Sequence, residues 1–564
     1  MTPTSHLGAD TKEPSARHKI SGRSALSARW ACAAALAGCV ALAILCRVPF
    51  LAVPLTNDEG GYAYVARQWA AGARLYSDAW VDRPQGLVLL FRLFIAIAPS
   101  TVGLRLCAAI YVGLSLLLLA YVGMRLYGKA AGLCAAALYA VVSSGPQIEG
   151  FIVNGELLAT LPAVAAVALL LRSRDAARPA VLLFLAGVAA GGALLVKQSA
   201  IDGPIVVLLF APIGAGLSAR ARLRRVALAF AGLAVAPALS AAYGAATGWS
   251  AYINAVVLDN LRYRSFDASA NTLNAAVAGF GWFWSEDALL IILALVAVAL
   301  PVGQSMVDGR WSMVKRRHTK VTPDAPHSDY RLSTIDHRPS TIDHRLWPWL
   351  PLPWLAAATV AVTLGGLYSR HYFVQLLPPL CLLAAAGLVT GARAVRRLPW
   401  TALLAVVPLA ALAMTARTDA LYYVGSSPVA ISQRLYGWPV YTYQAALVDF
   451  LRRRVPAGQP FFVAYAAAPL HYLTGRPSVT RYLWRRPLGT IPGAYAAALR
   501  AVERGEPVCV IPVQPVTQPP GDARMATALS RRYVVAWRRP GLTVLCRGPE
   551  NRRATTPIPP RPIS

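Results

Sequence analysis

The stretch WACAAALAGCVALAILCRVPFLAVPLTNDEGGYAYVARQW, residues 30–69, joins a long apolar run to a polar segment with two adjacent carboxylates. The apolar part continues to Leu55 and is interrupted by a charge once, at Arg47. A run of about 20 apolar residues can cross a bilayer as a helix. This run is longer than the apolar part of a signal peptide and lacks a convincing cleavage site, so we expect a retained membrane anchor. The carboxylates of Asp58 and Glu59 follow it directly.

The composition is that of a membrane protein. Of the 564 residues, 56% are hydrophobic and 14% are charged, whereas soluble domains have about 25% charged residues. The net charge is +30, from 55 Lys and Arg against 25 Asp and Glu. Many basic residues stand in short clusters between apolar runs, which favours cytoplasmic loops of a membrane protein and argues against a nucleic-acid partner. Basic residues before the first run place the N-terminus in the cytoplasm.

Further apolar runs predict an α-helical polytopic membrane protein with about 11 to 13 crossings. The runs are residues 104–124, 130–145, 156–171, 180–197, 203–217, 224–247, 286–303, 349–367, 372–390 and 399–416. The segment 86–99 is short and contains Arg92, so it either re-enters the membrane or crosses it once. The basic clusters assign alternate loops to the cytoplasm. The loops expected outside are residues 55–87, 146–155, 198–203, 248–285 and 368–371.

We divide the chain into three parts. A cytoplasmic basic tail covers residues 1–28, a transmembrane region covers 29–417, and a small extracytoplasmic α/β domain covers 418–564. In the last part, PFFVAYAA, PVCVIPV and RRYVVAWRRPGLTVLC predict strands, the last of them a hairpin around Pro540 and Gly541. The final fifteen residues have the composition of a disordered tail.

Two further features of the sequence concern metal binding and disulfide formation. The cytoplasmic loop 304–348 contains the tandem STIDHRPSTIDHRL, with His337 and His344 seven residues apart. Such Asp-His pairs can bind a metal, but a short duplication in a polar, Pro-containing loop is more often filler, so we predict no metal site. In the outer domain, a disulfide between Cys509 and Cys546 is left open.

One set of motifs resembles a known family. The outward Asp58-Glu59 pair, the following YAYVARQW, the Arg-Pro element of DRPQG and the distant HYFVQLLPPL resemble the polytopic glycosyltransferases of the GT-C fold. The similarity is greatest to the group that includes protein O-mannosyltransferases and the aminoarabinose transferases that act on lipid A. It covers roughly residues 29–395, and DRPQG departs from the Lys-Pro-Pro or His-Pro-Pro more usual there.

The resemblance implies a multi-pass cell-membrane enzyme. Such an enzyme takes a hexose or pentose from a polyprenyl-phosphate donor and passes it to a hydroxyl of a lipid, glycan or protein acceptor on the outer face. It implies that Asp58 is the general base, since a weakly nucleophilic hydroxyl must lose its proton. We expect the negative charge of Glu59 to raise the basicity of Asp58. No cofactor is required, and a divalent cation at Asp58 and Glu59 is left open.

The lipid phosphate that leaves needs positive charge or directed donors. The residues expected to contact the donor phosphate are Arg83, Lys197, Arg370 and His371. Other polar residues near outer helix ends are expected to contact sugar or acceptor: Tyr62, Gln85, Asn154, Glu156, Gln198, Tyr372 and Gln375. Simpler roles exist for several of them, because Lys197 and Arg370 could snorkel, Arg83 could pair with Asp82, and Glu156 could serve the helix dipole.

A transporter or lipid flippase is the alternative function. It would share the many spans and the outward basic residues. Transporters usually show paired halves with broken helices at matching positions, and the sequence shows no such internal repeat. The Asp-Glu and Arg-Pro elements therefore favour a transferase.

Overall fold

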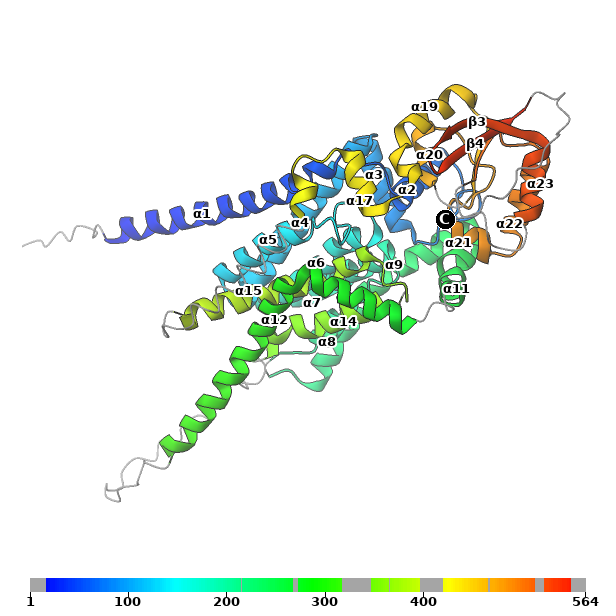
Figure 1. Cartoon of the computed structure of the whole chain (residues 1–564). Helices are drawn as coiled ribbons and strands as arrows, with labels where there is room; N and C mark the ends of the chain where they lie inside the picture. The colour runs from blue at the N-terminus through cyan, green and yellow to red at the C-terminus, as the bar shows by residue number, and fades with distance from the viewer. Residues whose placement is uncertain are drawn as a thin grey trace, which may run out of the picture.

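The protein, seen here in a computed structural model, is a helical bundle with a small α/β domain at one end (Figure 1). The structure describes residues 17–214, 216–266, 272–316, 346–364, 366–395, 419–464, 467–512 and 522–548. The predicted fold class is confirmed. Four expectations concern segments outside the described residues: the beginning of the basic tail, the tandem STIDHR repeat, the apolar run 399–416 and the last fifteen residues.

Eight helices of the described chain are long and apolar enough to cross a membrane. These spans lie along α1 (Arg17–Leu45), α4 (Thr101–Tyr127), α6 (Gly155–Arg172), α7 (Pro179–Val196), α9 (Ala219–Thr247), α12 (Thr272–Arg316), α14 (Pro351–Leu364) and α15 (Leu377–Val395). Shorter apolar helices are α3 (Gln85–Ile97), α5 (Lys129–Val142) and α8 (Asp202–Phe210). The expected count of 11 to 13 crossings stays a prediction, because the run 399–416 lies outside the described residues.

Helix α3 does not carry the chain across the bundle. It begins at Gln85, whose side chain bonds Ser240 in the last turns of α9. Helix α4 begins close to the first loop, because Arg105 in its second turn pairs with Glu59. Both ends of α3 therefore lie at the same end of the bundle. Residues 86–99 therefore make no net crossing of the bundle, which is what the alternation of the loops required.

The loops that were predicted to share one side of the membrane meet at one end of the bundle. The amide of Val153 donates to the Glu59 carboxylate, so the second outer loop lies against the first. Gln198, from the third, donates to the main-chain carbonyl of Asp82. We call this the site end. Residues 55–87, 146–155 and 198–203 are thus neighbours in space, although they are far apart in the sequence.

The described basic clusters around Arg125 and Arg174 lie at the opposite end of the bundle. Arg125, in the last turn of α4, pairs with Asp175 in the 3-10 turn Ser173–Asp175. Arg174 lies over the ring of Trp347, 4.3 Å from its centre, in the 3-10 turn Trp347–Trp349 that precedes α14. The charge separation used to assign the loops is therefore present between the two ends of the fold.

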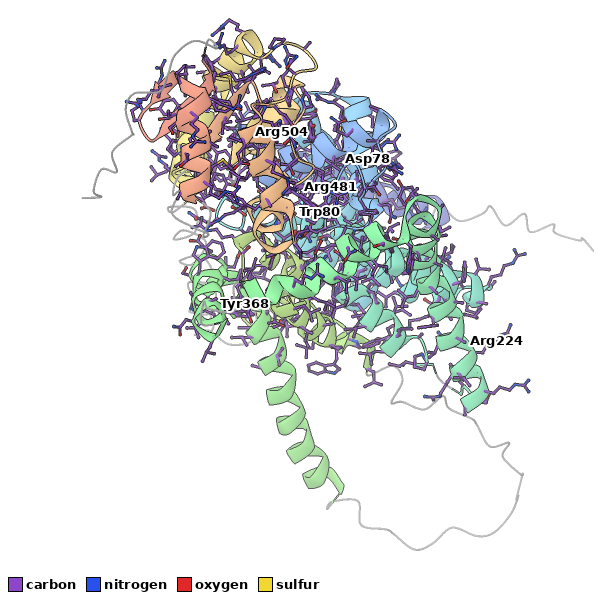
Figure 2. The ribbon with its side chains drawn as sticks, turned by 90° about the vertical axis from the view of Figure 1, so that its right-hand side faces the viewer. Asp78, Trp80, Arg224, Tyr368, Arg481 and Arg504 are labelled. Atoms are coloured by element: carbon purple, nitrogen blue, oxygen red, sulfur yellow. A yellow bond between two sulfur atoms is a disulfide. The ribbon has the colours of Figure 1, made fainter. Side chains whose placement is uncertain are left out.

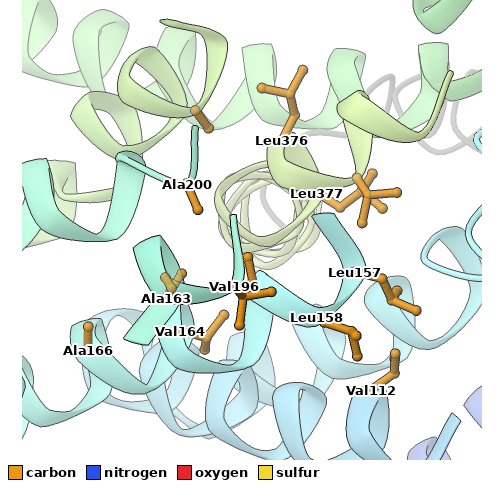
Figure 3. Packing of buried hydrophobic residues seen from close by; sticks show 14 of the residues in the cluster. Val112, Leu157, Leu158, Ala163, Val164, Ala166, Val196, Ala200, Leu376 and Leu377 are labelled. Carbon is orange, nitrogen blue, oxygen red and sulfur yellow. The ribbon is translucent and has the colours of Figure 1, made fainter. Parts of the chain in front are cut away.

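Between the two ends, small residues let the helices approach closely. A Cβ placed on Gly187 of α7 would lie 2.0 Å from the carbonyl oxygen of Ala229 in α9. Elsewhere aliphatic side chains fill the core, and Figure 3 shows Leu158 of α6, Val196 of α7 and Leu377 at the start of α15 among the residues of this cluster. This rigid packing holds the loops of the site end in place.

The C-terminal domain is built on a four-stranded sheet of order β1-β2-β4-β3. The strands are β1 (Phe462–Ala464), β2 (Cys509–Pro512), β3 (Tyr533–Arg539) and β4 (Leu542–Arg547). β1 and β2 are parallel, while β4 pairs antiparallel with both β2 and β3, and β3–β4 is the predicted hairpin. Cys509 and Cys546 face each other across β2 and β4 and form a disulfide, which answers the question the sequence left open. The helices here are α17 (Pro428–Tyr436), α18 (Pro439–Thr442), α19 (Gln444–Arg454), α20 (Ala468–Thr474), α21 (Arg485–Thr490), α22 (Ala494–Glu503) and α23 (Asp522–Arg532).

This domain is fixed on the loop 55–87 of the site end. The side chain of Gln444 bonds both the N–H and the carbonyl of Leu55, at 3.0 Å each. The amide of Ala468 donates to the side chain of Asn57 at 2.9 Å. Asn57 begins α2 (Asn57–Ala70), the helix that carries the two carboxylates, and α20 packs against it. The C-terminal domain therefore covers the start of α2.

Candidate active site

The two adjacent carboxylates stand in the first turn of α2. Thr56 is the N-cap: its hydroxyl accepts from the Glu59 amide, and the Glu59 carboxylate accepts from the Thr56 amide. This reciprocal capping box fixes where the helix begins. Successive helical residues diverge by about 100°, so Asp58 and Glu59 point to different sides. Their environments differ accordingly.

Glu59 is fully buried and does not line the cavity that Asp58 faces. Its two oxygens accept from the guanidinium of Arg105 at 2.9 and 2.7 Å. Arg105 also donates to the carbonyls of Phe50 and Val53, at 2.7 and 2.5 Å, so the pair clamps the end of the first span. A cation shared by Asp58 and Glu59 would have to displace this guanidinium. Among the described residues, no group of three or more His, Cys, Asp or Glu side chains is placed to hold a metal.

Asp58 faces a cavity of about 130 Å³ at the site end. The lining residues are Asp58, Tyr62, Trp80, Asp82, Arg83, Asp259, Ser369, His371, Tyr372, Trp484, Arg486, Pro487 and Thr490. Five of the residues selected from the sequence are therefore brought together here: Asp58, Tyr62, Arg83, His371 and Tyr372. They come from α2, from the loop before α3, and from the 3-10 turn Arg370–Leu376 before α15.

The Asp58 carboxylate is a half-buried acceptor. The indole N–H of Trp484 donates to its Oδ1 at 3.0 Å. Burial raises the pKa of Asp58 above its ordinary value, although His371, Arg83 and the Trp484 hydrogen bond act in the opposite direction. The sequence predicted a basic Asp58 but assigned the cause to Glu59. Burial is the main cause in the structure, and the charge of Glu59 is compensated by Arg105.

Arg83 brings a permanent positive charge to the same cavity. Its guanidinium is 2.9 Å from the Asp82 carboxylate, as the simpler alternative for this residue anticipated. Burial alone would lower the pKa of Arg83, but Asp82 and other neighbouring groups keep it well above the ordinary arginine value. Gln198 and Asn260 both donate to the Asp82 carbonyl, at 2.8 and 2.9 Å, and Tyr76 donates to the Arg83 carbonyl. Gln198 thus holds the loop that carries Arg83.

A charged network lies directly behind the cavity wall. Lys197 pairs with Glu156, and the ammonium lies 4.2 Å from the centre of the Tyr372 ring. His371 bonds Glu149 through Nδ1 at 2.6 Å, and its Nε2 is 3.8 Å from the Glu156 carboxylate. Lys197 and Glu156 were predicted as ligand contacts, yet in this structure they contact one another and support His371 and Tyr372. Glu149 was not predicted.

Four of the selected residues lie away from the cavity. Gln85 bonds Ser240. Asn154 is the N-cap of α6 and accepts from the Leu157 amide. The Arg370 guanidinium lies over the Trp282 ring, 5.4 Å from its centre. Gln375 lines a separate small hollow beside Asp202 and Trp354.

The C-terminal domain supplies cavity residues that the sequence did not indicate. Trp484 and Arg486 come from the start of α21, more than 400 positions after Asp58. Burial lowers the pKa of Arg486 to about 10, while Asp82 and Asp58 act to raise it. The cluster WRR at residues 484–486 was the available signal, and nothing in its local pattern separates it from the other arginine pairs of this domain.

Comparison with known proteins agrees with this architecture. Residues 82–241 match the family model described as dolichyl-phosphate-mannose-protein mannosyltransferase. The sequence has no significant match among curated proteins.

Solved structures give a wider match. The crystal structure of ArnT from Cupriavidus metallidurans bound to undecaprenyl phosphate is 14% identical, with a TM-score of 0.58 over 91% of this chain and 98% of that one. The apo state of the same protein is 15% identical, with a TM-score of 0.53 over 90% and 97%. The archaeal oligosaccharyltransferase AglB from Archaeoglobus fulgidus, in complex with an inhibitory peptide and a dolichol-phosphate, is 13% identical, with a TM-score of 0.48 over 94% and 75%.

The correspondence with ArnT extends over nearly the whole length of both chains, and the mannosyltransferase match runs from the Arg83 loop into the second half of α9. The chain is therefore a polytopic membrane protein with the GT-C glycosyltransferase fold.

Proposed function

We propose that the protein is a membrane glycosyltransferase that moves a sugar from a polyprenyl-phosphate carrier to a hydroxyl acceptor. The observation that carries the proposal is the position of Asp58. It is a half-buried carboxylate with a raised pKa, in the cavity that also contains Arg83 and His371. ArnT, which shares the fold, was crystallised with undecaprenyl phosphate. A base beside a fixed cation is what sugar transfer from a lipid phosphate requires.

In the proposed reaction, the acceptor oxygen attacks the anomeric carbon of the sugar. The bond between that carbon and the phosphate oxygen breaks, and its electron pair leaves with the carrier. Asp58 takes the proton of the acceptor hydroxyl as the new bond forms. Arg83 faces the negative charge that develops on the phosphate. Because burial raises the pKa of Asp58, the carboxylate is a stronger base than an exposed one.

We place the cavity on the extracytoplasmic side of the membrane. The basic clusters at the opposite end of the bundle support this orientation through the positive-inside rule. The Cys509–Cys546 disulfide supports it as well, because disulfides persist in oxidising compartments. A reporter enzyme fused after residue 560 that is active only in the cytoplasm would overturn the orientation.

The test uses the full chain purified into lipid vesicles. Undecaprenyl phosphates carrying different radiolabelled sugars are supplied with a membrane and cell-wall extract as the source of acceptor. We expect one labelled sugar to move from the lipid fraction into product. A positioned base is worth about 10² to 10⁴ in rate, so Asp58→Asn should lower that transfer by about this factor.

The matched control is Asp78→Asn, which changes an exposed carboxylate in the same loop that pairs with Arg74. It should keep wild-type transfer. If Asp58→Asn transfers sugar within about threefold of wild type while Glu156→Gln is inactive, the base is another carboxylate. If no labelled sugar is consumed by the wild-type protein, the proposed function is wrong.

A further inference from the structure

A second and larger hollow adjoins the catalytic cavity. It has a volume of about 700 Å³ and shares two wall residues with the cavity, Trp80 and Asp259. It lies between the C-terminal domain and the short helices α10 (Trp249–Ile253) and α11 (Asp259–Phe266). Figure 2 shows Trp80 and Arg481 close together, where the C-terminal domain meets the first outer loop. We call this hollow the aromatic groove.

Rings form much of the wall of the aromatic groove. Tyr76, Trp80, Trp249 and Tyr482 all contribute. Tyr76 and Trp80 are buried, so the accessible ring surface comes from Trp249 and Tyr482. Trp80 and Tyr482 are held edge to face, with ring centres 5.5 Å apart. Trp249 is 52% exposed, so its ring surface is accessible to a ligand in the groove. Aliphatic lining in the described residues is confined to Ala251, Ile491 and Pro492.

Hydrogen-bonding groups stand between the rings. Asp259 and Arg262 form a pair at 3.1 Å, and burial raises the pKa of Asp259. Arg481 donates to the Ser77 carbonyl, and its guanidinium lies 5.0 Å from the centre of the Tyr482 ring. The lining therefore combines aromatic rings with planar groups that accept or donate two hydrogen bonds.

We propose that the aromatic groove binds the acceptor and that the acceptor is a carbohydrate. This inference rests on the proposed function, because it assigns the second substrate of the same reaction. A pyranose presents an apolar C–H face, which stacks on a ring, and a rim of hydroxyls, which pair with carboxylate, amide and guanidinium groups. Only the reacting hydroxyl needs to pass Trp80 and Asp259 to reach Asp58.

Two other occupants fit the lining less well. A prenyl tail requires a continuous aliphatic channel, whereas rings and polar side chains dominate here. An extended peptide is usually held through main-chain hydrogen bonds at a sheet edge or groove. The strands of the C-terminal sheet contribute no residue to the described lining of the groove.

The experiment measures binding to the full chain in lipid nanodiscs by saturation-transfer NMR. The probes are a panel of trisaccharides, namely chitotriose, maltotriose and mannotriose, and a Ser/Thr-containing peptide of similar mass. We expect at least one trisaccharide to bind and Trp249→Ala to weaken its binding about tenfold, which is the loss of about 1.4 kcal/mol. Trp249→Phe keeps a ring and should lose less. Trp438→Ala removes another half-exposed tryptophan, outside the groove, and is the matched control.

Each remaining outcome counts against the proposal. No bound trisaccharide, or equal binding by Trp249→Ala and Trp438→Ala, overturns it. Preferential binding of the peptide replaces a carbohydrate acceptor with a protein one. Binding of undecaprenyl phosphate and consumption of the labelled donor are measured on the same variants. If the protein consumes the labelled donor but the groove binds no saccharide, this inference is wrong and the proposed function stands. If the wild-type protein does not consume the donor, the proposed function itself has failed.

Discussion

The sharpest test of the site is the replacement Trp484→Phe. The indole N–H of Trp484 donates to Asp58 Oδ1 at 3.0 Å, and this residue belongs to the C-terminal domain. Phe lacks the donor and keeps a ring that can still pack on Tyr62, whose ring centre is 5.5 Å from that of the indole. The substitution therefore removes one hydrogen bond to the proposed base with little change in packing.

The size and direction of the effect follow from linkage. A hydrogen bond to a charged group contributes about 1.5–3 kcal/mol. One pKa unit corresponds to about 1.36 kcal/mol, so loss of the bond should move the titration of Asp58 by about 1–2 pH units. The bond favours the ionised carboxylate, hence its loss raises the pKa of Asp58 further. The base acts only when it is ionised. As the pH is lowered, activity should therefore be lost at a higher pH in the variant than in the wild type.

The assay is the pH dependence of kcat/KM for transfer of the labelled sugar, over about pH 5 to 9, since this profile reports ionisations of the free enzyme. We expect the acidic limb of Trp484→Phe to move upward by about 1–2 pH units while the plateau changes little. The control is Trp438→Phe, which changes a half-exposed tryptophan that does not line the cavity. It should leave the acidic limb of the pH profile unmoved. An unmoved limb in Trp484→Phe, with or without a lower plateau, would refute the reasoning.

Three further changes test separate parts of the structure. Arg83→Ala should lower kcat/KM for the donor at least tenfold with little change in thermal unfolding, and full turnover at limiting donor would assign the phosphate to another cation. Glu59→Gln leaves the buried Arg105 without its anion and should destabilise the fold by about 3–5 kcal/mol. The assay is the midpoint of thermal unfolding in detergent, which should fall. An unchanged midpoint would contradict a stabilising role for the Glu59–Arg105 pair. Cys509→Ser should lower the free energy of unfolding of the C-terminal domain by about 2–4 kcal/mol. In intact cells the wild-type Cys509–Cys546 pair should resist alkylation until a reductant is added, and labelling without reductant would contradict an outer location.

The architecture was largely predictable because it depends on long, redundant signals. Apolar runs of span length and basic clusters between them predicted the bundle and which loops share an end. Alternating residues and a Pro-Gly turn predicted the hairpin of β3 and β4. The path of residues 86–99 was not decided by the sequence, since a short apolar helix with one arginine fits either alternative. Contacts of Gln85 and Arg105 at one end of the bundle decide it.

The site was less predictable because polar side chains near helix ends have several possible partners. Asp58 and Arg83 were selected through the family resemblance and their position in the loop 55–87, and both line the cavity. Asn154 and Gln198 stand at equally suitable helix ends, yet one caps its own helix and the other holds the chain at Asp82. Such choices depend on distances of a few ångströms between elements that are remote in sequence. Residue type and spacing carry no information at that scale.

The glycines that follow the carboxylates show how the two halves of the molecule depend on each other. Gly60 and Gly61 occupy the first turn and a half of α2, where glycine costs about 1 kcal/mol relative to alanine. A Cβ on Gly60 would lie 2.3 Å from the main chain of Pro469, and one on Gly61 would lie 2.3 Å from the ring of Trp484. Both glycines are thus required by the approach of the C-terminal domain. That approach buries Asp58 and delivers the indole N–H to it, so the environment proposed to make Asp58 a base exists only when the C-terminal domain is docked.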